Sequence, residues 1–485
     1  MSQHPLTPQQ EQAFTAVQAF LTGDDDCFVL QGSAGTGKST LISTLVAHLK
    51  ELNKEIKLMA PTGRAARVLA RITRHKVFTV HASIYQHADV ESEDDDDLHY
   101  QFNLRHDCPE NAVIVVDEAS MIGNDTRVEY PQHAFLAFGS GQVLTDLMQY
   151  AGLLALLKSQ VKIIFVGDSS QLPPFGESIS TALSAPMLQQ QFGLRCQSFQ
   201  LTDVVRQAEH SPILKQAQFL RDAMISQQFR RLSWQPRQAD FDVPPEAEAI
   251  RLKAEHPFSN TVILLAHSNR RVNELNEQVR AIIWQQAHAP LQINDILLVC
   301  CNHFKSNLMN GDMVKVITIE AEPEYKKITV PKRKNFSTQT VHLLFRKVQI
   351  RFRVSHDEAQ TIDTLILESF LTGKRGNLLY EEQQALAYDF HRRMMEQKID
   401  RKSPQYLDAM LNDPYMNVLQ VKYGYALTCH KAQGGEWDTA IVDLEGKFFY
   451  KNEASYRWMY TAMTRARKRL WFIGTVPFTA MDWLD

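Results

Sequence analysis

The chain has 485 residues, which is too long for a single hydrophobic core, so we expect three or four modules. Its 52 basic and 55 acidic residues give a net charge of −3, which excludes a globally basic nucleic-acid-binding protein; any basic track must be local. The polar start of the chain lacks a secretory signal, and no apolar run could span a bilayer. We therefore expect a cytoplasmic protein without membrane contact. The six cysteines form no C-x-x-C pair, so we expect free thiols and no zinc site.

The first elements have a recognisable order. A helix is predicted over 6–22, because Phe14, Val17 and Phe20 share one face. An apolar strand over 27–30 follows, and after a glycine-rich stretch residues 41–46 have helical spacing. Strand, glycine-rich loop and helix together are the context of a phosphate-binding P-loop. The candidate nucleotide-binding residues in it are Gly32, Ser33, Ala34, Gly35, Thr36, Gly37, Lys38, Ser39 and Thr40.

The chemistry of a P-loop follows from these residue types. Glycines let backbone N–H groups turn inward toward phosphate oxygens, and the positive end of the following helix adds to the attraction. Lys38 would reach the β- and γ-phosphates, and Ser39 would ligate Mg²⁺. The alternative is a chance Gly/Ser-rich loop, but every fixed position of the motif is filled.

Further buried strands are predicted along the first half, at 57–60, 113–116 and 161–166, with a helix at 64–72. Alternating strands and helices predict a parallel sheet that is covered on both faces. Two stretches interrupt this pattern. Residues 86–110 contain an acidic run at 91–97, interpreted as a solvated tip, and an alternating stretch at 98–102 typical of an exposed hairpin strand. Residues 124–142 are interpreted as a loop insertion before a helix at 143–158.

The second half begins another α/β unit near residue 201, with a strand at 262–266 and a helix at 269–286. Residues 225–260 are interpreted as helix and loop without an assigned role. Short β-runs over 292–355, with a turn at Asn310-Gly311-Asp312, predict a small inserted β-barrel. Residues 358–412 are expected to be helical. Buried strands then return at 418–427, 440–442 and 470–473.

Two polar loops follow predicted strands. Asp117 and Glu118 end the strand at 113–116, where a carboxylate beside a P-loop is placed to hold Mg²⁺ and the next one to activate the attacking water. The alternative is a pair that caps the next helix. Gln171, after the strand at 161–166, could contact a γ-phosphate, or it could belong to an ordinary loop stiffened by prolines.

The ordered set of motifs resembles that of superfamily 1 DNA helicases of the RecD-like/Dda-like branch. The resemblance covers residues 6 to about 474, and the last two motifs are the most discriminating because P-loop kinases lack them. The matching stretches are Leu6–Gln10, the P-loop, Ala60–Ala66, Thr79–His81, Asp117–Ser120, Gly167–Pro173, Leu201–Gln207, Leu427–Gly434 and Tyr460–Arg467.

The resemblance implies a fold and nucleotide-site roles. The expected fold class is α/β, with two RecA-like P-loop NTPase motor domains, a small hairpin insertion and an inserted Src-homology-3-like β-barrel. Gln10 would read the adenine edge and favour ATP, and Gly434 would lie at the nucleotide. Arg206 and Arg465 would reach the γ-phosphate from the second motor domain, so that hydrolysis depends on closure. The alternative for each arginine is a surface salt bridge.

The resemblance also implies a groove for a nucleic-acid strand. Its expected residues, which would hold phosphates and stack on bases without reading sequence, are Pro61, Thr62, Gly63, His81, Thr428 and His430. Arg64 could join them or lie on a helix surface, and Lys431 and Gln433 would couple the groove to the nucleotide. Relatives carry a duplex-separating pin where residues 86–110 lie, so Tyr100 or Phe102 could be its wedge or could serve local packing. The acidic residues 91–97 would repel phosphates, which disfavours them as the pin.

These expectations combine into one organisation. Residues 1–200 form the first motor domain, with the hairpin at about 84–110; residues 201–291 and 418–485 form the second; residues 292–417 form the inserted barrel with a helical extension. The expected activity is that of a monomeric, ATP- and Mg²⁺-dependent helicase acting on single-stranded and fork DNA, 5′ to 3′. The alternatives are a translocase with little unwinding, an RNA helicase of the same superfamily, a loading module with an ATPase timer, and a small-molecule P-loop kinase.

Overall fold

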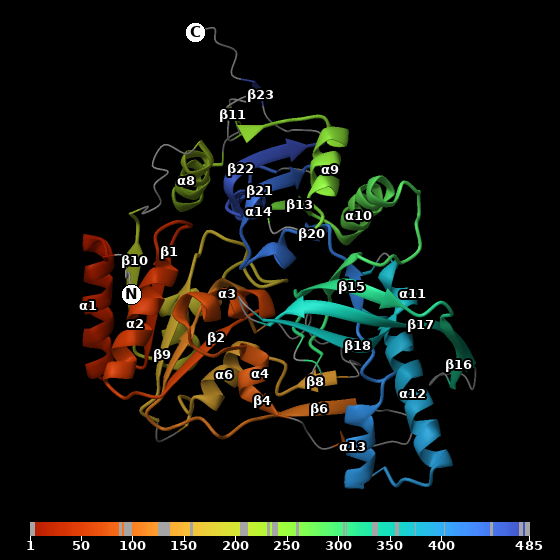
Figure 1. Ribbon diagram of the computed structural model, residues 1–485. Coiled ribbons are helices and arrows are strands. Elements are labelled where there is room, and N and C mark those ends of the chain that lie inside the picture. Colours follow the sequence, from red (N-terminus) through yellow and green to blue (C-terminus); the bar gives the residue numbers. More distant parts are fainter. Residues whose placement is uncertain are drawn as a thin grey trace.

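The computed structural model describes residues 5–86, 90–91, 99–124, 136–155, 159–203, 212–229, 233–234, 241–258, 261–303, 306, 308–331, 338–354, 358–373, 375–401, 403–446, 450–474 and 479–480. It contains two parallel sheets and an antiparallel β module, which lie side by side (Figure 1). Among the described helices, none has the length and apolar content needed to cross a membrane.

The domain that the sequence predicts as the first motor domain, and that keeps this name below, is built on a six-stranded parallel sheet in the order β10-β1-β9-β7-β2-β3. Alternate residues of β1 belong to different cores: Phe28 and Leu30 pack toward α1, α2 and α3, while Cys27 and Val29 pack toward α4, α6 and α7. The sheet is therefore covered on both faces, as predicted. Its strands and helices are α1 (Pro8–Thr22), β1 (Cys27–Gly32), α2 (Lys38–Glu51), β2 (Ile56–Ala60), α3 (Gly63–Thr73), β3 (Val77–Thr79), α4 (Val80–Ile84), β7 (Val113–Val116), α6 (Val143–Tyr150), β9 (Lys162–Gly167), α7 (Ala185–Phe192) and β10 (Cys196–Leu201).

A small second sheet projects from this domain. Its strand β6 (His99–Leu104) pairs antiparallel with β4 (Tyr85–Gln86) and β5 (Val90–Glu91), and parallel with β8 (Leu136–Phe138). The predicted hairpin strand at 98–102 is thus confirmed within a residue or two. The acidic run at 91–97 lies outside the described residues, except for Glu91.

The second motor domain has a five-stranded parallel sheet in the order β12-β22-β21-β13-β20, at the top of Figure 1. One face packs on α8 and α14, and the other on α9 and α10. The expected α/β fold with two parallel sheets is therefore confirmed. Its elements are α8 (Pro212–Ile225), β12 (Phe241–Asp242), α9 (Glu246–Glu255), β13 (Val262–Ala266), α10 (Asn269–Trp284), β20 (Ala426–Thr428), β21 (Trp437–Asp443), α14 (Glu453–Met463) and β22 (Ala466–Ile473); β11 (Ser233–Trp234) pairs with β23 (Thr479–Ala480) beside it.

The inserted module is a small closed barrel. Strands β19, β14, β15, β17 and β18 pair in turn, and Leu419 closes the ring because it exchanges backbone hydrogen bonds with residues 365 and 367 of β18. This agrees with the predicted barrel; its likeness to a Src-homology-3 module stays a prediction. The elements are β14 (Ile296–Val299), β15 (Met313–Ile319), β16 (Glu324–Pro331), β17 (Thr338–Arg353), β18 (Ala359–Leu367), α11 (Glu368–Leu371), α12 (Tyr380–Glu396), α13 (Pro404–Asn412) and β19 (Val421–Tyr423).

The barrel shares its core with the second motor domain. One continuous apolar cluster joins Leu264 of β13 and Leu275 of α10 to Leu297 and Val316 of the barrel strands. Since residues packed in one dense core move together, the barrel and the second sheet form a single body at this interface.

Three element predictions were wrong in part. Residues 359–367 form β18 rather than helix, because they pair with β17 along nine consecutive positions. The helix expected over 143–158 ends at Tyr150, where Gly152 at φ +69° turns the chain. The strand expected over 418–427 is two strands in different sheets, since β19 joins the barrel and β20 joins the second motor sheet.

Candidate nucleotide and nucleic-acid sites

Four loops of the first motor domain meet at one edge of its sheet. Strands β1, β9, β7 and β2 are neighbours and parallel, so their carboxyl ends lie together. These ends lead into the P-loop, the loop 168–172, the Asp117–Glu118 pair and the stretch Pro61–Gly63. Residues far apart in the sequence are therefore gathered at one edge, as the α/β pattern predicts.

The P-loop has the backbone that its glycines allow. Gly35 and Gly37 adopt φ values of +84° and +80°, in a region that residues with a side chain rarely occupy. The Thr36 hydroxyl donates to the Ser33 carbonyl oxygen at 2.9 Å, which tightens the loop. The Lys38 ammonium donates to the carbonyl oxygens of Gly32 at 2.7 Å and Ser33 at 3.1 Å. The lysine lies folded over the loop that would cradle a phosphate.

Gln10 connects α1 to the P-loop. Its side-chain oxygen accepts from the Thr7 backbone N–H at 3.0 Å, and its side-chain nitrogen donates to the Thr36 carbonyl oxygen at 3.0 Å. The residue is 2% exposed. One N–H and one lone pair of its amide remain for a ligand, which is the minimum that recognition of a base edge requires.

The carboxylates after β7 are close to one another and poorly solvated. Burial and the neighbouring Glu118 charge raise the pKa of Asp117 to about 7, and the Lys38 ammonium opposes this shift. Glu118 has a left-handed backbone, with φ of +51°. A hard divalent cation such as Mg²⁺ would relieve the repulsion between such oxygens, so the donor set fits that ion.

Several polar atoms at this edge are buried without a hydrogen-bond partner among the described residues. They are Glu118 Oε2, Gln171 Oε1, Ser33 Oγ and Ser120 Oγ. A buried polar atom without a partner costs about 1–3 kcal/mol, so a group of them in one place indicates a site built for a ligand.

The second motor domain packs against the loop after β9 and forms hydrogen bonds with it. Leu172 has its side chain in the hydrophobic core of the second domain. The Leu172 N–H donates to Thr461 Oγ1 at 2.9 Å, and its carbonyl oxygen accepts from Gln433 Nε2 at 3.0 Å. Arg457 donates to the carbonyl oxygens of Ser169 and Gln171. We call these contacts the loop clasp.

Arg465, the expected γ-phosphate contact, lies inside its own domain. It is 3% exposed, and its guanidinium donates to the carbonyl oxygens of Thr461 at 3.0 Å and Gly435 at 3.1 Å and to Thr464 Oγ1 at 3.0 Å. A contact with nucleotide would require it to exchange at least one of these bonds. Arg206, the other expected arginine, lies outside the described residues.

The stretch Pro61–Gly63 begins α3, and Thr62 caps that helix by accepting from the Ala65 N–H at 3.2 Å. The same helix docks on the barrel. Arg67 forms two hydrogen bonds with Asp312, at 2.7 Å and 2.6 Å. Arg64 is stacked over the Trp437 ring, 4.9 Å from its centre, and donates to the Gly311 carbonyl oxygen. We call the Arg67–Asp312 pair the latch.

Gly434 lies against the start of α3, and its expected contact with the nucleotide stays a prediction. A Cβ placed on it would be 2.9 Å from the Cβ of Ala65, and its φ is +71°. The close approach therefore joins the second motor domain to the start of α3, on the side of the expected groove.

The remaining groove residues, Thr428, His430 and His81, lie in three different surroundings. Thr428 lies beside a pocket that is also lined by Lys422, Lys431 and Arg375. His430 has its ring 5.9 Å from that of Phe175, which is 69% exposed. Lys422 is buried and donates to the carbonyl oxygens of Phe370 and Gly373, so Lys431, Arg375 and the exposed Phe175 ring are the features typical of a surface that binds a nucleic-acid strand.

His81 is packed among aromatic rings rather than held in the open. Its ring lies 5.6 Å from both Tyr85 and Phe138, and burial lowers its pKa to about 4. A neutral imidazole at neutral pH offers a phosphate a hydrogen bond at most, and no charge.

Phe102 also packs locally. Its ring is stacked on Phe138 at 4.5 Å, with an angle of 13° between the planes. This contact favours the packing alternative over the wedge for Phe102. The side chain of Tyr100 lies outside the described part, although its backbone pairs with Val90 and Leu136.

Sequence reasoning missed the residues that join the modules. Thr461 and Arg457 contribute to the loop clasp, the Tyr460 hydroxyl donates to Asp168 of the same loop, and Arg67 and Asp312 form the latch. Tyr460 and Thr461 belong to the motif Tyr460–Arg467, which the sequence analysis identified, but the motif does not indicate which residues they contact. Nothing in the sequence pairs Arg67 with a residue 245 positions away.

Comparison with known proteins agrees with the motif order. Residues 5–134 match the AAA domain family, and residues 423–473 match the UvrD-like helicase C-terminal domain. The chain is 25% identical over 460 residues to the ATP-dependent RecD2 DNA helicase of Deinococcus radiodurans, covering 92% of this chain and 47% of that protein. It is 24% identical to the ATP-dependent DNA helicase dda of Enterobacteria phage T4, covering 64% of this chain and 65% of that one.

The chain thus spans about half the length of the RecD2 protein that it matches. Among solved structures, the Bacteroides Pif1 helicase bound to single-stranded DNA aligns with 96% of this chain and 92% of that one, at a TM-score of 0.46 and 15% identity. This chain is therefore similar in sequence to superfamily 1 helicases of the RecD and Dda type, over 92% of its length for RecD2 and 64% for dda.

Proposed function

We propose that the protein is an ATP-dependent DNA helicase that moves along single-stranded DNA in the 5′ to 3′ direction and unwinds duplexes. One observation carries the proposal: the loop after β9 joins a second parallel sheet to an edge that carries a P-loop and buried oxygens without partners in the described part of the chain. An NTPase site held between two such bodies can convert nucleotide turnover into relative motion.

At the nucleotide site each residue has a distinct task in this proposal. Lys38 and the P-loop N–H groups bind the β- and γ-phosphates, and Gln10 faces the base. Ser39 and Asp117 hold Mg²⁺, which screens the phosphate charge when bound. Glu118 accepts a proton from the attacking water. Its Oε2 has no hydrogen-bond partner among the described residues and so offers an acceptor to that water.

The strand is proposed to bind where α3, β20 and the loop 172–179 face the barrel. Pro61, Thr62 and Gly63 contribute from the first motor domain, and Thr428 and His430 from the second. Lys431 and Arg375, which line the pocket beside Thr428, would attract the phosphates. The whole protein carries a net charge of −3, so this attraction is local.

Three neighbouring hypotheses remain open to test. A translocase would hydrolyse ATP when DNA is present but displace little strand. An RNA helicase of the same superfamily would bind more weakly once the 2′-hydroxyls are removed. A small-molecule kinase would hydrolyse ATP equally well without DNA. The proposed direction of movement rests on the resemblance alone.

The test is strand displacement with ATP and Mg²⁺ on matched duplexes that carry either a 5′ or a 3′ single-stranded tail. We expect displacement from the 5′-tailed duplex only, and none by the Lys38→Ala variant, which should still bind DNA weakly. Displacement from the 3′ tail alone would contradict the direction. DNA-stimulated ATP hydrolysis without displacement would favour the translocase, and ATP hydrolysis indifferent to DNA would favour the kinase.

A further inference from the structure

Tyr460 connects three segments at the junction of the two motor domains. Its hydroxyl donates to Asp168 Oδ2 at 2.6 Å and accepts from the Ala34 backbone N–H at 3.3 Å. Asp168 begins the loop after β9, and Ala34 belongs to the P-loop. One hydroxyl on α14 of the second domain therefore bonds to two separate segments of the first.

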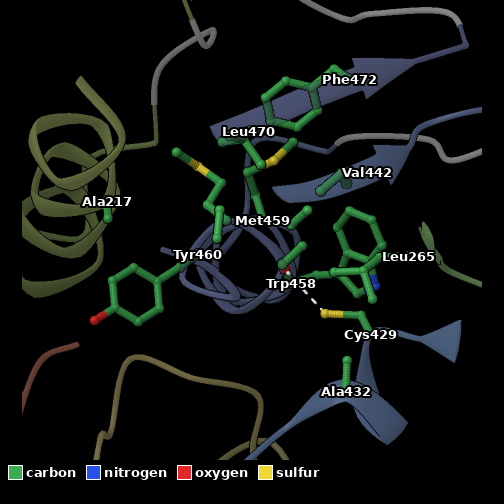
Figure 2. Close-up of a cluster of buried hydrophobic side chains, with 14 of the residues drawn as sticks. Ala217, Leu265, Cys429, Ala432, Val442, Trp458, Met459, Tyr460, Leu470 and Phe472 are labelled. Atoms are coloured by element: carbon green, nitrogen blue, oxygen red, sulfur yellow. Dashed lines mark hydrogen bonds between the residues drawn. The ribbon is translucent and has the colours of Figure 1, made fainter. Parts of the chain in front are cut away.

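The Tyr460 side chain is packed in the core of the second motor domain. Figure 2 shows it at the edge of the cluster around α14, with its hydroxyl directed away from Met459, Leu470 and the other labelled side chains. It is 1% exposed, and Asp168 is 2% exposed. Burial and the Asp168 charge raise the pKa of Tyr460 well above its usual range, so the hydroxyl keeps its proton and always donates.

Asp168 is also bonded to the loop that follows it. Its Oδ1 accepts from the Ser170 N–H at 3.0 Å, and the Gln171 N–H donates to its carbonyl oxygen at 3.1 Å. A displacement of the carboxylate would therefore displace Gln171, whose own side-chain oxygen is buried without a partner among the described residues. Leu172 transmits any such movement into the core of the second domain.

The two bonds of the hydroxyl differ in strength. The bond to Asp168 is short and involves a charge, whereas the bond from Ala34 is long and neutral. The weaker bond is the one on the P-loop, whose N–H groups a phosphate would reorient. Phosphate binding can therefore change the P-loop contact while the Asp168 contact persists.

We infer that Tyr460 is a positioning residue whose hydroxyl carries the state of the P-loop to the loop 168–172, and through it to the grip between the motor domains. The inference rests on the proposed function, since it assigns a route by which nucleotide would alter the affinity for the DNA strand. It makes Tyr460 distinct from the loop clasp, because within the described part of the chain no hydrogen bond joins Thr461, Gln433 or Arg457 to the P-loop.

The test compares Tyr460→Phe with Thr461→Val. Tyr460→Phe keeps the ring in its cluster and removes both hydroxyl bonds; Thr461→Val removes a bond to Leu172 and leaves the P-loop contact. The affinity for a fluorescent oligothymidylate is measured with and without a non-hydrolysable ATP analogue and Mg²⁺. Coupling between two sites is typically worth a factor of about 5–150 in affinity. We expect Tyr460→Phe to reduce this factor at least fivefold, and Thr461→Val to leave it within about twofold.

An unchanged factor in Tyr460→Phe would overturn the inference. So would an equal loss in both variants, since Tyr460 would then be one structural contact among several. Thermal unfolding checks that both variants are folded.

A second measurement needs neither a variant nor DNA. In the unaltered protein, the analogue should change hydrogen exchange at the N–H groups of Ser170, Gln171 and Leu172. No change there, with the analogue bound, would overturn the inference. Failure of the unaltered protein to bind the oligonucleotide would instead count against the proposed function, because the exchange measurement is independent of DNA.

Discussion

The latch between α3 and the barrel leads to a quantitative prediction. Arg67 and Asp312 share two charge-assisted hydrogen bonds, at 2.7 Å and 2.6 Å, and Arg67 also donates to the Arg353 carbonyl oxygen. Asp312 is 6% exposed, so its carboxylate depends on these partners. Since the strand is proposed to bind where α3 faces the barrel, we expect the latch to enclose it, so that release of the strand requires the latch to open.

The expected magnitude follows from the geometry. A hydrogen bond to a charged group contributes about 1.5–3 kcal/mol. Arg67 is 25% exposed, and water would replace part of the interaction when the latch opens. We therefore take about 2–3 kcal/mol for the pair as a whole. Since each 1.4 kcal/mol is a factor of ten, Arg67→Met should speed dissociation of single-stranded DNA by roughly 30–150-fold.

The assay is stopped-flow dissociation of a labelled oligothymidylate into an excess of unlabelled competitor. The matched control is Arg71→Met, which removes the same charge from an exposed position one turn further along α3. Both variants should lose a similar, small amount of general attraction for DNA. A dissociation rate within threefold of the unaltered protein for Arg67→Met, or equal acceleration by Arg71→Met, would refute the reasoning.

The other predictions concern single side chains. Glu118→Gln should retain ATP binding but lower phosphate release in the presence of DNA by about 10²–10⁴-fold; normal turnover would mean that another group is the base. The pKa of His81 is about 4 in the folded protein and 6.5 when unfolded, so the unfolded chain takes up the proton first as the pH falls. The free energy of unfolding, measured with denaturant, should therefore be up to about 3 kcal/mol smaller at pH 4 than at pH 7. In His81→Phe, the free energy of unfolding should vary less with pH. Phe102→Ala removes the ring stacked on Phe138 and should lower thermal stability, at a cost of about 1–3 kcal/mol; loss of unwinding at unchanged stability would support the wedge instead.

Sequence patterns predicted the parts of the fold that depend on local order. The strands at 113–116 and 262–266 are apolar throughout, and such runs suit strands buried on both faces of a parallel sheet. Because parallel strands end at a common edge, the positions of the P-loop, Asp117 and Gln171 followed from the same pattern. Their roles in binding and hydrolysis stay predictions.

Patterns failed where a distant partner decides the structure. Residues 359–367 carry enough polar residues to suggest an exposed helix, yet pairing with β17 makes them a strand. The run at 418–427 was predicted as one strand, but Gly424 separates a barrel strand from a motor strand. Single-sequence periodicity contains no information about which of two sheets will accept a strand.

The candidate site also combines features that local sequence indicates with features that depend on distant contacts. Residue types and spacing indicated Lys38 and Glu118, but not that Leu172 would enter the core of the second domain. They also did not indicate that Gly434, which the family resemblance assigns to the nucleotide, would approach Ala65 of α3 so closely. Contacts between modules depend on shape and complementary partners that are far apart in the sequence, so they become visible only in the folded chain.

The barrel contacts the second motor domain and the first motor domain through different kinds of interface, and this difference determines which domains can move apart. The barrel and the second motor domain share one apolar core. Separating them would expose many buried side chains to water, which costs a free energy of about 25 cal/mol for each Å² of apolar surface. The latch instead consists of polar groups and is worth about 2–3 kcal/mol by the reasoning above. A nucleotide present at a thousand times its dissociation constant supplies about 4.1 kcal/mol to the state that it prefers. In the proposed cycle, nucleotide binding can therefore open the latch but cannot separate the barrel from the second motor domain, so those two should move as one body against the first.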